Sequence, residues 1–125
     1  MEYKDLFIKS REVAKNAYAP FSKFNVGAAL LASDGRVFTG VNVENSSFGG
    51  TICAERTAFT KAISEGVREF TAIAITGNGK EAWPCGICRQ FMYEFAPDLT
   101  VITGDSEEDL QIMPLRELLP HGFKL

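Results

Sequence analysis

The amino-acid sequence predicts an α/β fold in which a mixed five-stranded sheet carries helices on both faces. Two features predict this fold. The runs FNVGAALLAS and RVFTGVNVE are rich in β-forming residues, and Asp34-Gly35 between them is a strong signal for the tight turn of an antiparallel hairpin. From residue 53 onward, helical and strand patterns alternate, which predicts a crossover connection and parallel neighbouring strands. A sheet with both kinds of pairing is mixed.

The first half of the chain should contain a helix, the hairpin and a second helix. Apolar residues recur at helical spacing between residues 2 and 18, until Pro20 breaks the pattern. The two strands of the hairpin should cover residues 24–33 and 36–44. After a loop with two adjacent glycines, residues 53 to about 65 favour a helix.

The second half should alternate strands and helices. We expect a buried strand at 70–76, a helix from 85 to about 95, and a second buried strand at 99–103. An edge strand should surround residues 110–113, and Pro114 should begin a short helix that ends near residue 119. The acidic run GDSEEDL between the last two strands is interpreted as a solvated turn.

Composition favours one domain over residues 1–125, because a chain of this length with 46% hydrophobic residues suits a single core. No apolar run approaches the roughly 20 residues that span a membrane, and MEYKDLF lacks the features of a signal peptide. We therefore expect a cytoplasmic protein without a membrane partner. A net charge of -3 gives no general attraction to phosphate backbones, so a nucleic-acid partner is not expected.

The chain has three cysteines, and all of them fall at predicted helix starts. An odd number of cysteines in a reducing compartment favours metal binding or catalysis over disulfides. Cys85 and Cys88 lie three residues apart in one first turn, where the helix dipole stabilises thiolates, and Cys53 begins another helix. Three thiolates indicate zinc, provided that the two helix starts meet. The only histidine, His121, lies in the C-terminal tail, which leaves a coordination position for water.

Glu55 follows Cys53 by two residues and could approach the same ion from the helix end. A carboxylate near the ion but not bound to it can take a proton from water and deliver it to a substrate. Two other interpretations remain open at this point. The cysteines could form a closed structural zinc site, or C-x-x-C could be a redox pair.

The motifs CAERTA and PCGICRQ, together with AYAPFSKFNVGAALL, GVNVENSSF and RELLP, resemble the cytidine deaminase family over almost the whole chain. The resemblance is to its small, three-cysteine, homotetrameric branch, and it implies a three-layer sandwich fold and one Zn²⁺ per chain. It implies Cys53, Cys85 and Cys88 as zinc ligands and Glu55 as the proton carrier. The implied reaction is hydrolysis of cytidine and 2′-deoxycytidine to uridine and 2′-deoxyuridine with release of ammonia.

The same resemblance assigns the residues around the substrate. It implies that Asn42 and Glu44 bind the sugar 3′-hydroxyl, that Phe24 packs on the pyrimidine, and that Ala54 belongs to the same pocket. It implies that Phe123 enters the active site of a neighbouring subunit, in a homotetramer whose active sites are shared between subunits. Arg56 corresponds to an arginine that hydrogen-bonds the ligand thiolates.

One departure from the family concerns the side of the pocket that faces the N4 amino group. Trp83 stands where the family usually has serine before Pro84, and the loop before it is short. The family uses the carbonyl at this position to receive the departing amino group. The indole must either pack away from the pocket or form part of its wall on the N4 side, where Trp83 and Pro84 are the candidate residues. We expect it to pack away, which leaves room for substituents on N4.

Two other functions stay open. The protein could deaminate modified cytosine nucleosides, either N4-substituted cytidines or a blasticidin S-like antibiotic. It could also be a zinc-stabilised binding module without catalysis.

Overall fold

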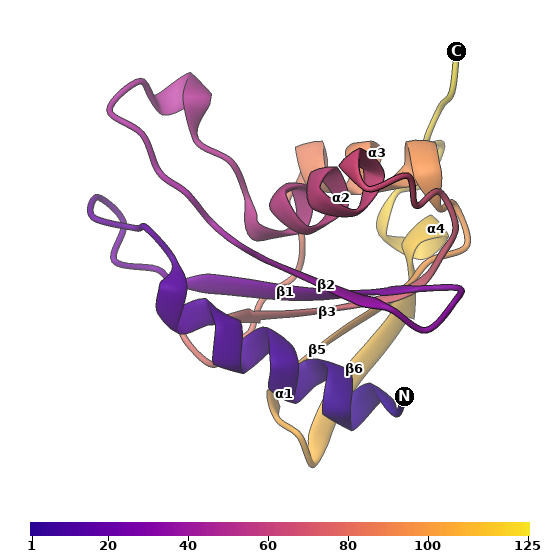
Figure 1. Cartoon of the computed structure of the whole chain (residues 1–125), viewed down its shortest axis with the longest axis horizontal. Helices are drawn as coiled ribbons and strands as arrows, with labels where there is room; N and C mark the ends of the chain where they lie inside the picture. Colours follow the sequence, from indigo (N-terminus) through magenta and orange to yellow (C-terminus); the bar gives the residue numbers. More distant parts are fainter.

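The computed structural model describes all residues 1–125 and contains a mixed sheet with α-helices on both faces (Figure 1). The helices are α1 (Tyr3–Val13), α2 (Ala54–Ser64), α3 (Gly86–Phe95) and α4 (Leu115–Leu118), with 3₁₀ turns η1 (Ala14–Asn16) and η2 (Phe48–Gly50). The strands are β1 (Val26–Ala32), β2 (Val37–Val41), β3 (Phe70–Gly77), β4 (Lys80–Glu81), β5 (Thr100–Ser106) and β6 (Asp109–Pro114).

The sheet has the order β2-β1-β3-β5-β6 and confirms the predicted mixed topology. The β1–β2 hairpin is antiparallel, with Leu31 opposite Val37, and β1 also pairs antiparallel with β3. β3 and β5 run parallel and are joined through α3, as a crossover connection requires. The prediction of five strands was one short, because the two-residue strand β4 pairs with β3 beside the main order. So short a strand gives no period-2 pattern to detect.

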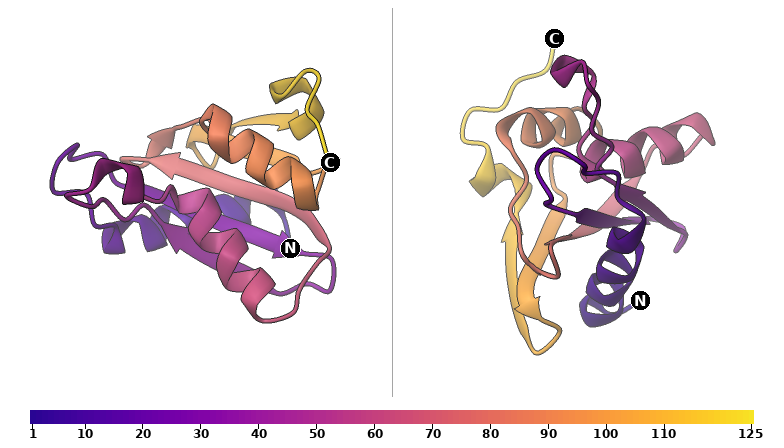
Figure 2. Two further views of the ribbon diagram at one scale, coloured as in Figure 1. Left: turned by 90° about the horizontal axis from the view of Figure 1, so that it is seen from above. Right: turned by 90° about the vertical axis from the view of Figure 1, so that its left-hand side faces the viewer.

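The two faces of the sheet carry separate apolar clusters. In Figure 1 the sheet is seen nearly edge-on, with α1 below it and α2 and α3 above it. Side chains alternate along a strand, so Ala28 and Leu30 of β1 belong to the cluster between the sheet and helices α2 and α3. Ala29 belongs to the cluster between the sheet and α1. Viewed from above, α2 and α3 lie side by side across the sheet (Figure 2).

Gly40 of β2 lets α2 approach the sheet closely. A Cβ at this position would overlap the carbonyl oxygen of Ala54 and stand 2.5 Å from the amide nitrogen of Ala58. Only glycine leaves room for this contact. The strand thereby fixes the height of the first turn of α2 above the sheet.

The first helix is shorter than predicted. α1 ends at Val13, η1 follows, and Tyr18 already pairs with the segment beyond β2. The amide of Tyr18 donates to the carbonyl of Asn42 at 3.0 Å, and the carbonyl of Tyr18 accepts from the amide of Glu44 at 2.8 Å. These long-range bonds replace the helical ones that the local pattern favours. No helix of the structure combines the length and apolar character that crossing a membrane requires.

Candidate metal centre and active site

Three cysteine sulfurs converge where the N-termini of α2 and α3 meet. Cys53 is the N-cap of α2, Cys85 is the N-cap of α3, and Cys88 lies in the first turn of α3. All three Sγ atoms lie within 4.8 Å of one another, and those of Cys53 and Cys85 are 3.9 Å apart. Tetrahedral Zn–S bonds of about 2.3 Å place two sulfurs about 3.8 Å apart. The donor set therefore fits one zinc ion.

The surroundings of the sulfurs favour negative charge at Cys53. The hydrogen bond from the Cys88 thiol, and after it one from Arg56, lower the pKa of Cys53 to about 5. The Nη2 of Arg56 lies 3.5 Å from Sγ of Cys53. The hydrogen bond between Cys88 and Cys53, together with burial, raises the pKa of the Cys88 thiol. Of these two thiols, Cys88 therefore keeps its proton. A guanidinium beside thiolates offsets the net negative charge of a three-sulfur site.

Glu55 lies in the first turn of α2 and is only 4% exposed. Burial raises the pKa of its carboxyl group to about 7. Such a group exchanges protons readily near neutral pH. It shares a cavity with Cys53 and Cys85, so two of the clustered sulfurs and a titratable carboxyl group face the same space.

The cavity has a volume of about 280 Å³. Residues from five parts of the chain line it: Ser22, Phe24, Val26, Asn42, Glu44, Thr51, Ile52, Cys53, Ala54, Glu55, Ile75, Ala82, Trp83 and Cys85. The cavity thus brings together Cys53, Cys85, Glu55 and four of the five residues predicted for substrate, namely Phe24, Asn42, Glu44 and Ala54. Phe123 lies elsewhere, where its backbone nitrogen and oxygen bond the side chain of Gln90 on α3.

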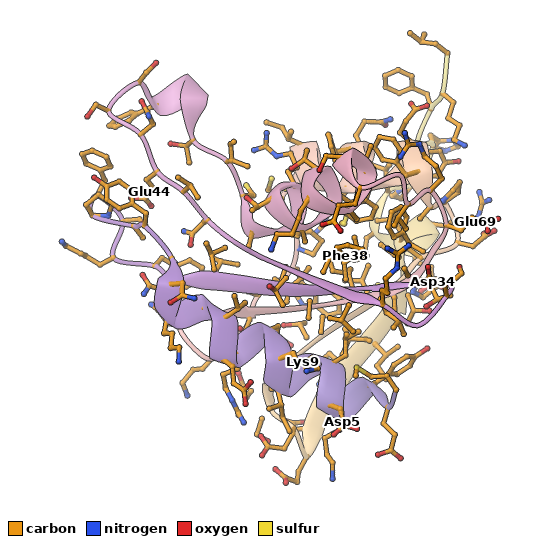
Figure 3. All side chains as sticks on the ribbon, viewed as in Figure 1. Asp5, Lys9, Asp34, Phe38, Glu44 and Glu69 are labelled. Carbon is orange, nitrogen blue, oxygen red and sulfur yellow. The ribbon has the colours of Figure 1, made fainter.

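Asn42 and Glu44 both bond the backbone of the loop that precedes β1. The side chain of Asn42 accepts from the amide of Val26 at 2.9 Å and donates to the carbonyl of Phe24 at 2.8 Å. The carboxylate of Glu44 accepts from the amides of Phe21 and Ser22 and from the Ser22 hydroxyl. Figure 3 shows Glu44 between the loop that precedes β1 and the loop that carries η2. These side chains therefore shape the cavity as well as line it.

Trp83 and Pro84 lead into Cys85. Trp83 lines the cavity and also packs against the buried cluster under α2 and α3. The expectation that the indole would leave the cavity is therefore only half right, since the residue contacts both the core and the cavity. Pro84, also considered for the N4 side of the pocket, is buried and does not line the cavity, and its carbonyl accepts a hydrogen bond from Nε of Arg89 at 2.7 Å.

Sequence reasoning missed six of the lining residues. Ser22 and Thr51 add hydroxyl groups, and Val26, Ile52, Ile75 and Ala82 add apolar surface. The apolar members resemble ordinary strand and loop residues, so no local pattern distinguishes them. Ser22 in the motif PFSKF was the one detectable signal, because it is a polar residue close to Phe24.

Known proteins share both the sequence and the fold. Residues 1–104 match the family model described as the cytidine and deoxycytidylate deaminase zinc-binding region. A cytidine deaminase from Halalkalibacterium halodurans is 46% identical over 98% of this chain and 95% of that protein. A probable cytidine deaminase from Dictyostelium discoideum is 50% identical over 86% of this chain and 74% of that protein. The crystal structure of cytidine deaminase from Burkholderia pseudomallei is 43% identical, with a TM-score of 0.92 over 98% of this chain and 100% of that one.

Proposed function

This chain belongs to the cytidine and deoxycytidylate deaminase family, and from that premise we propose that it converts cytidine and 2′-deoxycytidine to uridine and 2′-deoxyuridine, with release of ammonia. One observation carries the proposal beyond family membership. Two residues of the three-sulfur cluster, Cys53 and Cys85, line the same cavity as the buried Glu55, and this cavity has a size suited to a nucleoside. In pyrimidine salvage, such an enzyme returns cytosine nucleosides to the uridine pool.

Cys53, Cys85 and Cys88 would hold the zinc ion, with Arg56 balancing their charge. When bound there, zinc supplies Lewis acidity that lowers the pKa of water to about 7. Three protein ligands are the number found in catalytic zinc sites, whereas structural sites use four. The chain's only histidine, His121, is exposed in the C-terminal tail, which favours the catalytic interpretation.

Glu55 would move the protons of the reaction. Water adds across the C4–N3 bond of the pyrimidine, and Glu55 takes a proton from that water and gives it to N3. The hydroxyl proton then passes to the amino group, the C4–N4 bond breaks, and ammonia leaves with a carbonyl at C4. A carboxyl group with a pKa of about 7 can both accept and return these protons near neutral pH.

Asn42 and Glu44 would bind the sugar, and Phe24 would pack on the pyrimidine ring. Each polar side chain retains acceptor capacity after bonding the loop before β1. Ala54 would present its backbone beside the base, next to Glu55. No lysine or arginine lines the cavity, so a 5′-phosphate would find no cationic partner there. This favours free nucleosides over nucleotides.

Modified cytosine nucleosides are the second candidate substrates. Trp83 stands where the resemblance to the family implies a serine, and it would form the side of the pocket that faces N4. Methylamine release from N4-methylcytidine, compared with ammonia release from cytidine, tests this candidate. A blasticidin S-like antibiotic would require binding of a different sugar, whereas Asn42 and Glu44 suit a free hydroxyl.

Residues 1–125 would form one domain that assembles as a homotetramer in the cytoplasm. Exposed apolar side chains support assembly. Tyr18, Val43 and Ile52 lie on segments that are bridged to one another, Phe21 packs on Phe48, and Phe123 and Leu125 lie near the C-terminus. In the tetramer, Phe123 would complete the active site of a neighbouring subunit. Sedimentation of an active monomer would contradict this arrangement.

Incubation with cytidine tests the main proposal, with the ultraviolet change to uridine as the readout and zinc quantified in the same sample. We expect turnover, about one zinc per chain and much slower reaction with cytidine 5′-monophosphate. A protein that binds zinc and cytidine without turnover would instead be a binding module.

A further inference from the structure

We propose that Thr103 is a positioning residue that fixes the cavity wall formed by Ala82 and Trp83. The Thr103 side chain is fully buried in β5 and lies outside the cavity lining. Its Oγ1 accepts a hydrogen bond from the amide of Ala82 at 2.8 Å and donates one to the carbonyl of Ile75 at 2.8 Å. One hydroxyl group thus joins two residues that line the cavity from separate parts of the chain.

Thr103 stands where the ordinary ladder of the sheet stops. The parallel pairing of β3 with β5 ends at Ala74 opposite Ile102, one residue before Ile75 and Thr103. The pairing of β3 with β4 ends at Glu81, one residue before Ala82. Beyond these points, backbone groups of both segments need other partners. The Thr103 hydroxyl supplies a partner to each.

Two other side chains also hydrogen-bond the backbone of the segment that leads to Cys85. Asp105, two residues after Thr103 in β5, accepts from the amide of Glu81 at 3.2 Å. At the other end, Arg89 bonds the carbonyl of Pro84 at 2.7 Å. Residues 81–84 are therefore held by side chains at three points, and Thr103 is the only fully buried one.

Trp83 lies between Ala82, which bonds Thr103, and Pro84, which bonds Arg89. The proposed function places its backbone carbonyl beside the amino group that leaves, so the inference rests on that function. Small displacements of a group that contacts the reacting atoms reduce the rate strongly. Removing the Thr103 hydroxyl takes this partner from the buried carbonyl of Ile75 and from the half-buried amide of Ala82, and we expect the segment to move in response.

Thr103→Val tests the inference, because it removes the hydroxyl while nearly preserving side-chain shape. Thr76→Val is a closely matched control. Thr76 is equally buried on the adjacent strand β3, and its Oγ1 has no hydrogen-bond partner in the structure. Thr103→Ser restores the hydroxyl, and Thr103→Ala is a second variant without it, for use if valine prevents folding.

Two readouts separate positioning from general stability. Trp83 is the only tryptophan, so its fluorescence emission and its quenching by acrylamide report on this segment alone. The second readout is kcat for cytidine per bound zinc. We expect Thr103→Val to shift the emission, increase quenching and lower kcat about tenfold, with a smaller change in KM. Thr103→Ser should return both readouts toward the natural protein, and Thr76→Val should change neither.

Unchanged fluorescence and kcat in Thr103→Val would overturn the inference. Changes of equal size in Thr76→Val would also overturn it, as would a Thr103→Ser variant whose fluorescence and kcat stay like those of Thr103→Val. If the natural protein did not deaminate cytidine, the proposed function would fail separately. The Trp83 fluorescence of the four variants would still decide whether Thr103 positions the wall.

Discussion

The ring of Phe24 lies directly against the backbone of Gly77. A Cβ at Gly77 would overlap Cζ of Phe24 and stand 2.7 Å from Cε2. The glycine is in regular strand β3, so its role is to provide space. Asn78, the next residue, accepts a hydrogen bond from the amide of Asn25 at 2.8 Å. The end of β3 therefore sets the position of the loop that carries Phe24.

Gly77→Ala should raise KM for cytidine several-fold, because the added methyl group displaces the ring that is proposed to pack on the pyrimidine. Phe24 is 43% exposed and can swing outward, so the free energy of unfolding should fall by only about 1 kcal/mol. Steady-state kinetics and denaturant titration measure the two effects. Gly49→Ala is the control, because a Cβ there meets no atom within 4 Å. An unchanged KM in Gly77→Ala would contradict the role given to Phe24.

Glu55→Gln should keep about one zinc per chain and lower kcat by at least about 100-fold, because the amide cannot carry a proton. The three sulfurs are unaffected by this change. Metal analysis and cytidine turnover on the same preparation provide the measurement. Glu65→Gln, at the exposed end of α2, should behave like the natural protein. Normal turnover in Glu55→Gln would refute the proton-transfer mechanism.

Cys88→Ser should lose zinc and stability together, since metal-binding free energy at such a site is also folding free energy. Cys88 is buried at the start of α3, so the loss loosens the contact between the two helix N-termini. We expect the Tm to fall by roughly 10 °C or more. A chelator should lower the Tm of the natural protein similarly and leave that of Cys88→Ser unchanged. If the chelator also lowered the Tm of Cys88→Ser, the ion would bind elsewhere.

The parts of the fold that were predictable from the sequence are those with strong local signals. Asp34-Gly35 marks the hairpin turn, and cysteines at helix starts mark the sulfur cluster, because dipoles and turn geometry act within a few residues. Residue spacing alone could not establish that the starts of α2 and α3 meet. That contact depends on the crossover and on the close approach at Gly40.

The unpredicted features arise from long-range hydrogen bonds. Tyr18 leaves the helical pattern to pair beside β2, and β4 exists only because Lys80 and Glu81 meet β3. Thr103 resembles any threonine in an apolar strand, and nothing near it in sequence indicates its bonds to Ile75 and Ala82. Roles of this kind depend on how distant segments pack.

Asn42→Ala should weaken catalysis for cytidine more than for its 3′-deoxy analogue. The substitution removes a predicted partner of the sugar hydroxyl, and leaving a buried polar group unpaired costs about 1 to 3 kcal/mol. It also removes the bonds to Val26 and Phe24, so stability must be measured alongside kcat/KM for both nucleosides. Thr39→Ala on β2 is a control outside the cavity lining. An equal decrease in kcat/KM for the two nucleosides would mean that Asn42 only supports the backbone at Phe24 and Val26 and does not bind the sugar hydroxyl.

The carboxylate of Glu44 should stabilise the protein in a pH-dependent way. The Ser22 hydroxyl, and after it the backbone amides of Ser22 and Phe21, hold the pKa of Glu44 below its ordinary value. A lowered pKa means that the folded state prefers the charged carboxylate. The stabilisation is therefore fully present above the pKa of the unfolded chain, roughly 4.3, and is lost as the pH falls through the lower folded value.

Glu44→Gln removes the charge and keeps the shape, so its unfolding free energy should be lower than that of the natural protein at pH 7. The difference should stay constant down to roughly pH 5 and then shrink, because only the natural carboxyl group takes up a proton there. Denaturant titrations across this range measure the difference. Introducing Ser22→Ala into both proteins should reduce this difference, since it removes the hydroxyl group that contributes most to lowering the pKa of Glu44. A difference that grew on acidification would mean that Glu44 is stabilised in its protonated form, which would contradict the hydrogen bonds to Ser22 and Phe21.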